Sequence, residues 1–202
     1  ANSAYLSPGL AYNPAGIEKN NNAVASYKTA AGIMTDEITS NINILAIPGI
    51  REPYVTDFVS RKVRDYGLAL YLMDVVEYDE NSNRLYDDSS AKPDVTETSD
   101  QFDTRAIDNN YVASYFPDIT IDDTKNNRRV GVPASIAALA ALGFNDKVAF
   151  PWFAPAGFNR AALDFVKNVD VRLNKSDRDR LQDARINPID TFPRAGFVIF
   201  GQ

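Results

Sequence analysis

The side chains available for chemistry are carboxylates, lysines, tyrosines and hydroxyls, because the sequence contains neither histidine nor cysteine. Without these two residue types the chain cannot build a Ser-His or Cys-His nucleophile pair, a histidine-ligated zinc site or a disulfide. Acid–base catalysis would need carboxylates, lysine or tyrosine with pKa values shifted strongly towards neutrality. A hydrolase is therefore disfavoured, whereas a carboxylate pair or an oxygen-ligated Mg²⁺ or Ca²⁺ site stays open.

The net charge of −6 comes from one segment, which is the first place to look for a cation site. Residues 77–110 contain ten acidic and three basic side chains, a net charge of −7, and the rest of the chain carries +1. The run Asp87-Asp88-Ser89-Ser90 offers oxygen ligands, but neither the EF-hand spacing that ends in Glu nor a DxSxS pattern is present. We predict a solvated loop, a small hairpin insertion or a mobile flap over 77–110, without a metal site.

Two other polar motifs have simple structural interpretations. The Pro48-Gly49 junction could present backbone N–H groups to a phosphate, but one glycine is a poor phosphate loop and neither GxGxxG nor GxxxxGK[ST] occurs. We predict a simple turn there. Asn174-Lys175-Ser176 matches a glycosylation sequon, which we discount because no signal-peptide pattern opens the chain. We assign no catalytic, cofactor-binding or metal-binding residue.

Basic and aromatic side chains gather in the C-terminal half of the sequence. The basic side chains are the pair Arg128-Arg129 and a second group that comprises Arg172, Lys175, Arg178, Arg180 and Arg185. These side chains either contact acidic groups of a partner or form a solvated helix face balanced by aspartates, and both interpretations stay open. The aromatic group is expected in the core or an interface rather than in a pocket, and comprises Phe150, Trp152, Phe153 and Phe158. Neither nucleic-acid binding nor a membrane span is expected, because no basic surface and no apolar run of ~20 residues is present.

Helix-like and strand-like patterns alternate along the chain and would position these groups. The predicted helices are 24–38 (or from about 35), 53–66, 133–142 closed by Gly143, 160–167 capped by Asn159, and 176–185. The predicted strands are 42–47, 68–73, 111–121, 169–173 and 197–200, with a turn at 122–127, an aromatic strand or loop at 147–153 and irregular chain at 186–193. The strand–helix–strand order over 42–73 indicates a parallel crossover.

The predicted fold class is α/β, with a mixed, largely parallel central sheet flanked by helices. We divide the chain into an N-terminal arm and helix (1–40), an α/β core (41–76 and 111–202) and an acidic insertion (77–110).

Several short motifs in a fixed order resemble the contractile tail sheath proteins of myovirus-type bacteriophages. The motifs, between about Asn43 and Gln202, are the strand 43–49 ending in Pro-Gly, Tyr111 with Tyr115-Phe116-Pro117, Val132-Pro133 with Ser135, the loop 153–157, Leu181 with Ile186-Asn187, and Gly196 before Phe200-Gly201. Two features depart from the family pattern. Ala184-Arg185 stands where the family has glycine before Ile-Asn, and the sequence stops after Gln202. The resemblance implies a truncated piece that lacks a C-terminal domain.

The resemblance implies a structural virion protein and no enzyme activity. Sheath subunits polymerise around the tail tube and contract to drive the tube through the host envelope for genome delivery. The implied partners are neighbouring copies, the tail tube protein, the baseplate and the tail terminator, and the isolated piece is expected to be monomeric. The implied location is the phage tail, assembled in the host bacterial cytoplasm. We further hypothesise that charged faces, including Arg178 and Arg180, slide past one another during contraction.

Two alternatives to the sheath reading remain. One is a carboxylate- or Mg²⁺-dependent α/β enzyme that acts on a phosphorylated ligand. The other is a receptor-binding or adhesion module whose binding loop is the acidic segment.

Overall fold

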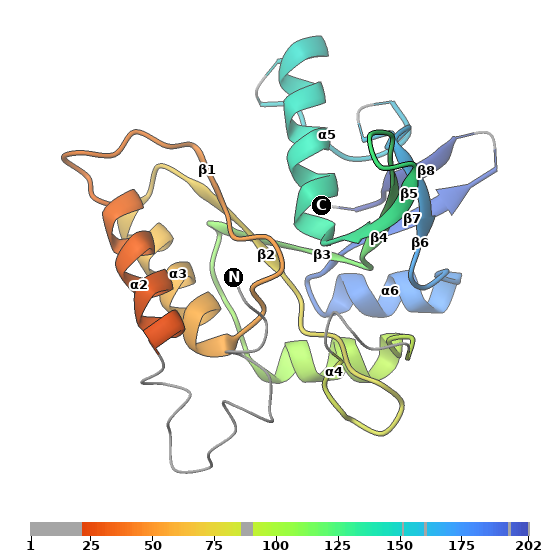
Figure 1. The fold of residues 1–202 in the computed structure, drawn as a ribbon, viewed down its shortest axis with the longest axis horizontal. Coiled ribbons are helices and arrows are strands. Elements are labelled where there is room, and N and C mark those ends of the chain that lie inside the picture. Colours follow the sequence, from red (N-terminus) through yellow and green to blue (C-terminus); the bar gives the residue numbers. More distant parts are fainter. Residues whose placement is uncertain (1–21, 86–90, 151, 160, 194, 202) are drawn as a thin grey trace.

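Helices and strands alternate along the part of the chain that the computed structural model describes, residues 22–85, 91–150, 152–159, 161–193 and 195–201 (Figure 1). The helices are α2 (Asn22–Met34), α3 (Pro53–Tyr66), α4 (Val95–Thr104), α5 (Ala134–Val148) and α6 (Lys175–Asp183). The strands are β1 (Ile44–Ala46), β2 (Leu70–Asp74), β3 (Val112–Phe116), β4 (Ile119–Asp123), β5 (Arg128–Val132), β6 (Val166–Val169), β7 (Asn187–Phe192) and β8 (Gly196–Ile199). Within this part, no helix combines the length and the apolar character that a membrane span requires.

The strands form two sheets. The five-stranded sheet has the order β1-β2-β3-β7-β8, with parallel pairing from β1 to β7 and an antiparallel final strand. The smaller sheet has the antiparallel order β5-β4-β6. The predicted α/β class with a mixed, largely parallel sheet is thus confirmed.

Both faces of the five-stranded sheet are buried. Successive side chains of a strand point to opposite faces, so one strand contributes to two cores. Tyr71 and Met73 of β2 belong to a core shared with α2, α3 and α6, whereas Leu72 between them belongs to a second core with α5. The second core contains four alanines of α5, which allow the helix to lie close to the sheet as expected from its small side chains: Ala134, Ala137, Ala138 and Ala141.

The predictions for the first strand–helix–strand unit are confirmed. Strands β1 and β2 pair in parallel around α3, which starts at Pro53. Gly67 ends α3 in a left-handed conformation with φ of 69°, and its N–H donates to the carbonyl of Val63. Glycine adopts this conformation without a steric penalty, which explains why the helix stops there. Helix α2 ends at Met34, so the alternative helix start near Thr35 is wrong.

The prediction of one strand over 111–121 is wrong. The chain forms two strands, β3 in the large sheet and β4 in the small one, separated at Pro117-Asp118. Proline has no N–H to continue a strand ladder. The predicted turn at 122–127 joins β4 to β5, a strand that we did not predict.

The acidic segment 77–110 contains a helix that the loop prediction missed. Helix α4 starts after Asp94, whose carboxylate accepts a hydrogen bond from the N–H of Glu97. Val95, Thr98 and Phe102 are buried at helical spacing, so an apolar stripe was hidden among the charges. Residues 86–90, which include the Asp-Asp-Ser-Ser run, lie outside the described residues.

Predictions for the C-terminal third were correct for the last strand and shifted or wrong elsewhere. Helix α5 continues past Gly143 to Val148, because Gly143 does not adopt the left-handed conformation that ends a helix. The predicted helix over 160–167 is absent from the described residues, and β6 covers 166–169 instead. Residues 186–193, predicted to be irregular, contain β7, which pairs with the neighbouring β8 and with β3 from a distant part of the chain. The predicted capping box at 176–179 lies two residues earlier, between Asn174 and Asp177.

Candidate functional site

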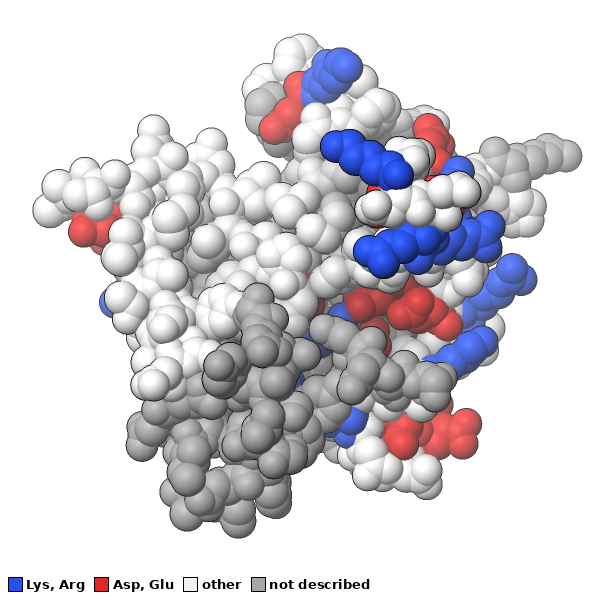
Figure 2. All heavy atoms as spheres, viewed as in Figure 1, with Lys and Arg blue, Asp and Glu red and all other residues white. Residues whose placement is uncertain are grey.

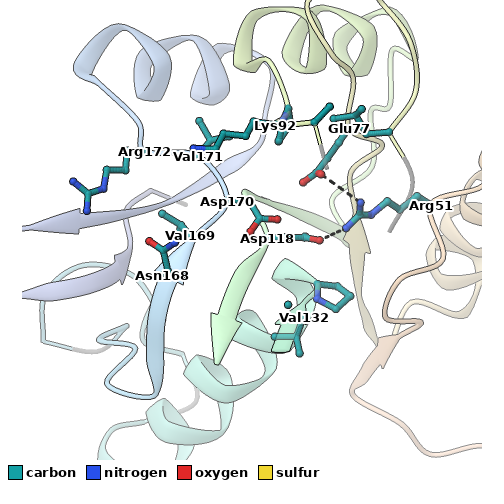
Figure 3. Close-up of a pocket in the computed structure, with 15 residues that line it drawn as sticks. Arg51, Glu77, Lys92, Asp118, Val132, Asn168, Val169, Asp170, Val171 and Arg172 are labelled. Atoms are coloured by element: carbon teal, nitrogen blue, oxygen red, sulfur yellow. Dashed lines mark hydrogen bonds and ion pairs between the residues drawn. The ribbon is translucent and has the colours of Figure 1, made fainter. Parts of the chain in front are cut away.

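A group of charged side chains, which we call the Arg51 cluster, lies where the two sheets meet, and its buried members are Arg51, Asp74 and Glu77 (Figure 3). It comprises Arg51, Asp74, Glu77, Asp118 and Asp170. Arg51 follows β1, Asp74 ends β2, Asp118 connects β3 to β4, and Asp170 follows β6. The cluster therefore collects residues from the carboxyl ends of parallel strands and from the small sheet. None of these five residues was predicted from the sequence to belong to a site.

Asp74 binds the start of α5 and the Pro48-Gly49 turn. Its carboxylate accepts hydrogen bonds of 2.9 Å from the N–H of Gly49, and from the N–H and hydroxyl of Ser135. Asp118 accepts a hydrogen bond of 3.1 Å from the N–H of Ala134, so two carboxylates meet the positive end of the α5 dipole. Because the Gly49 N–H is used internally, the simple turn is confirmed and this N–H is not directed at a phosphate.

Arg51 supplies the positive charge of the cluster. Its side chain lies almost completely buried, pairs with Asp118 through Nη2, and lies 3.6 Å from Glu77 through Nη1. Burial alone would lower the pKa of Arg51, but the neighbouring carboxylates of Asp118, Glu77 and Asp74 raise it. The guanidinium is thus firmly charged.

Burial has the opposite effect on the carboxylates of the cluster, because it raises their pKa values. Burial and the nearby Asp118 raise the pKa of Glu77 to about 8, against the lowering effect of Arg51. Burial likewise raises the pKa of Asp118 to about 6 and that of Asp170, although Arg51 opposes both shifts. Desolvation penalises a charged carboxylate, and one guanidinium does not compensate several of them.

The cluster borders a polar cavity of about 760 Å³ that Lys92 and Arg172 also line. Oxygen atoms of Glu77, Asp118 and Asp170 lie within 4.8 Å of one another, a spacing that a hard cation tolerates. Arg51 already lies between Glu77 and Asp118 as their counter-ion, and we assign no metal to this site.

The basic group on α6 contacts its own chain. Arg178 donates to the buried Asp190 at 2.5 Å, and its guanidinium lies 5.2 Å from the centre of the Phe192 ring. Arg180 lies 3.2 Å from Asp100 of α4. Arg185 donates to the carbonyl of residue 107, while Arg172 and Lys175 are exposed. The hypothesis of a sliding charged face therefore has to omit Arg178, which is a structural residue.

The remaining basic side chains belong to the small sheet. Arg128 and Arg129 of β5 are exposed and lie 3.8 Å and 3.6 Å from Asp123 and Asp122. Lys167 of β6 approaches Asp122 from the other side, at 4.0 Å. Figure 2 shows basic side chains gathered over this part of the molecule, whereas the opposite side, over α2, is largely uncharged.

An exposed group of apolar side chains lies at the last turn of α5 and in the loop after it. We call it the aromatic surface, and it comprises Phe144, Val148, Phe150, Trp152 and Phe153. The Phe150 and Trp152 rings stack with centroids 4.7 Å apart, and these side chains are 57% and 76% exposed. Asn145 holds the loop, because its side-chain amide donates to the carbonyl of Phe153 at 3.0 Å. A place in the core is therefore wrong for Phe150, Trp152 and Phe153, and the interface role stays a prediction.

Phe158 and Asn174 have local structural roles. Phe158 packs edge-on against Phe192 with ring centroids 5.2 Å apart, away from the aromatic surface. The Asn174 side chain accepts a hydrogen bond from the N–H of Asp177 in the capping box of α6.

Comparison with known proteins gives two kinds of similarity. No protein-family model matches the sequence. The chain is 39% identical over 95 residues to the tail sheath protein of Vibrio phage KVP40, and 34% identical over 98 residues to that of Enterobacteria phage T4. These alignments cover 47% and 48% of this chain but 13% and 14% of the relatives, so the match spans a small part of their length.

The fold is similar to that of solved sheath-related structures. It matches the helical sheath of the anti-feeding prophage in its contracted state with a TM-score of 0.56 and 21% identity, covering 91% of this chain and 43% of that one. A chain of the anti-feeding prophage baseplate matches with a TM-score of 0.55 and 21% identity, covering 87% and 41%. Over about half of its length, the chain is thus similar in sequence to phage tail sheath proteins, and its α/β fold is also found in a contracted helical sheath.

Proposed function

We propose that this chain is part of a structural subunit of a contractile phage tail sheath. In this function the subunits polymerise around a tail tube and contract to drive it through the host envelope. The observation that carries the proposal is the 39% identity to a phage tail sheath protein over 95 residues. The fold similarity to a contracted helical sheath over 91% of the chain supports it independently.

The proposed partners follow from this function. They are neighbouring copies of the same subunit, the tail tube protein, the baseplate and the tail terminator. The proposed location is the tail of the virion, with assembly in the host cytoplasm. Similarity to a chain in a baseplate structure supports the baseplate contact.

The described polar groups are organised for structure rather than for catalysis. Asp74 uses its carboxylate to hold a turn and a helix start, and Arg178 holds the buried Asp190. An enzyme acting on a phosphorylated ligand would need open N–H donors at the Pro48-Gly49 turn, where Gly49 already donates to Asp74. We therefore favour the sheath subunit over the enzyme.

The aromatic surface is the face that we propose for contact with a neighbouring copy. Aromatic side chains are enriched at protein interfaces, and a contiguous exposed group of them indicates an interaction site. The loop that carries Phe150 and Trp152 is held in place by Asn145, so little ordering would be needed on binding.

Electron microscopy of the full-length subunit that contains this chain, concentrated alone and with tail tube, tests the proposal. We expect hollow helical tubes with regular striations. Dispersed globular particles, even with tail tube present, would contradict the sheath function. In that case a thermal shift of several degrees with nucleotides and Mg²⁺ would favour the enzyme, because a ligand stabilises the state that it binds.

A further inference from the structure

The Arg51 cluster contains more carboxylates than cations. Asp74 has neutral N–H and hydroxyl donors for partners, which leaves Glu77, Asp118 and Asp170 around the guanidinium of Arg51. Their oxygen atoms approach within 4.8 Å, in a region where Glu77 and Arg51 are both only 7% exposed. Like charges this close in a poorly solvated site are not all ionised together.

Glu77 is the most buried of these three carboxylates, and its contact with Arg51 is longer than that of Asp118. It accepts a backbone hydrogen bond from Asp118, but its ion pair with Arg51 is 3.6 Å long, beyond hydrogen-bond distance. Asp118 has both an Arg51 contact and the Ala134 N–H. Asp170 lies nearer to solvent and to Lys92, whose charge favours its ionised form. The raised pKa of Glu77 agrees with this ranking by geometry.

The cluster also connects the two sheets. Arg51 and Glu77 follow strands of the five-stranded sheet, and Asp170 follows β6 of the small sheet. Asp118 lies between β3 and β4, which belong to different sheets, and its carbonyl accepts a hydrogen bond of 3.1 Å from the N–H of Asp170. Extra negative charge at this point therefore pushes apart groups that belong to different sheets.

We propose that the Arg51 cluster binds one proton at neutral pH, on Glu77, and that this proton holds the small sheet against the carboxyl end of the five-stranded sheet. Loss of the proton leaves three adjacent carboxylates, of which Glu77 is buried, with a single guanidinium. The contact between the sheets then loosens. This inference rests on the cluster alone and not on the proposed function.

The direction of the pH effect follows from linkage. Glu77 has a pKa of about 8 in the folded chain, above the ordinary glutamate value of 4.5, so the folded state binds the proton more tightly. Its contribution to stability is fully present below the ordinary value and is lost as the pH rises through about 8. The charged or titratable groups that surround Glu77 in the cluster and its cavity are Arg51, Asp74, Asp118, Asp170, Lys92 and Arg172. Among these, Asp118 and Asp170 also have raised pKa values and act in the same direction.

Thermal unfolding between pH 6 and pH 8.5 tests the proposal, with Glu77→Gln as the test variant and Glu80→Gln as its control. Glu80 is exposed and lies three positions away, so the same chemical change occurs outside the cluster. We expect the Tm of the unchanged chain to fall by roughly 3 °C per pH unit, because the folded chain binds one proton that the unfolded chain does not. Glu80→Gln should keep this slope. Glu77→Gln should lose it above pH 7, where Asp118, with a pKa of about 6, contributes little. A Glu77→Gln variant with the original slope would overturn the proposal.

A second measurement does not depend on whether the variant folds. The glutamate side-chain carbons of the unchanged chain can be titrated by NMR. We expect one glutamate to titrate near pH 8, together with increased exchange of the Asp170 amide, corrected for the intrinsic rate, above that pH. If every glutamate titrates below pH 6, the cluster binds no proton at neutral pH and the proposal is wrong.

Discussion

The two ends of α5 differ in whether the side chains around them have partners within the chain. The first turn meets the carboxylates of Asp74 and Asp118 in the buried Arg51 cluster, where each group has partners inside the chain. The last turn leads into the aromatic surface, where Phe150 and Trp152 stack on each other and stay exposed. Substitutions at the first end should therefore affect folding, and substitutions at the second end should affect assembly.

The largest effect is expected at the first end, for Arg51→Met. Removing the guanidinium leaves the buried carboxylates without their counter-ion, so we expect the free energy of unfolding to fall by about 3–5 kcal/mol. Arg64→Met is the matched control, because Arg64 is exposed and lies 3.9 Å from Asp65, and it should change stability by about 0.5 kcal/mol or less. Denaturant titration at pH 7 measures both. Equal stabilities for the two variants would show that the Arg51 cluster does not hold the fold.

A smaller effect is expected for charge reversal on α6. Asp190 is 2% exposed and pairs with Arg178, so Arg178→Glu places two like charges together and should destabilise by about 2–4 kcal/mol. Arg180→Glu disrupts an exposed pair with Asp100 and should cost about 1 kcal/mol or less. Only Arg180 is therefore suitable for testing whether charged faces slide during contraction. Similar losses for both variants in denaturant titration would disprove the distinction.

The smallest effect on stability is expected for the double substitution Phe150→Ser and Trp152→Ser. The free energy of unfolding should change by about 1 kcal/mol or less, because the rings are exposed and contact mainly each other. Assembly of the full-length subunit should nevertheless be lost, as measured by sedimentation and electron microscopy of its polymer. Ile38→Ser is the control, since it removes an exposed apolar side chain elsewhere. Normal tubes from the double variant would exclude the aromatic surface as a contact between copies.

Local signals explain which parts of the fold were predictable. Pro53 at the start of α3 and Gly67 at its end act within a few residues, and so the first unit was predicted correctly. The role of Pro117 as a boundary between sheets depends on where β4 pairs, which the local sequence does not specify. Strand β7 likewise depends on pairing with distant β3.

The Arg51 cluster was not predictable for the same reason. Its members are spread from residue 51 to residue 170, and only the folded sheet order brings them together. A partial signal existed, because Asp74 and Asp118 each come just after a buried strand residue, at the end of a run that should stay apolar. The aromatic surface was easier to anticipate, since its residues are adjacent in sequence.

The pairing of β3 with β7 has a consequence for synthesis on the ribosome. Tyr115 lies opposite Asn187 in the sheet, although about 70 residues separate them in the chain. One edge of β3 therefore emerges from the ribosome long before its partner strand exists, with its backbone groups unpaired. Such distant parallel pairing forms slowly, because the loop between the strands must close first. The five-stranded sheet is thus completed late, and the nascent chain depends on the early unit of β1, α3 and β2 for its first stable structure.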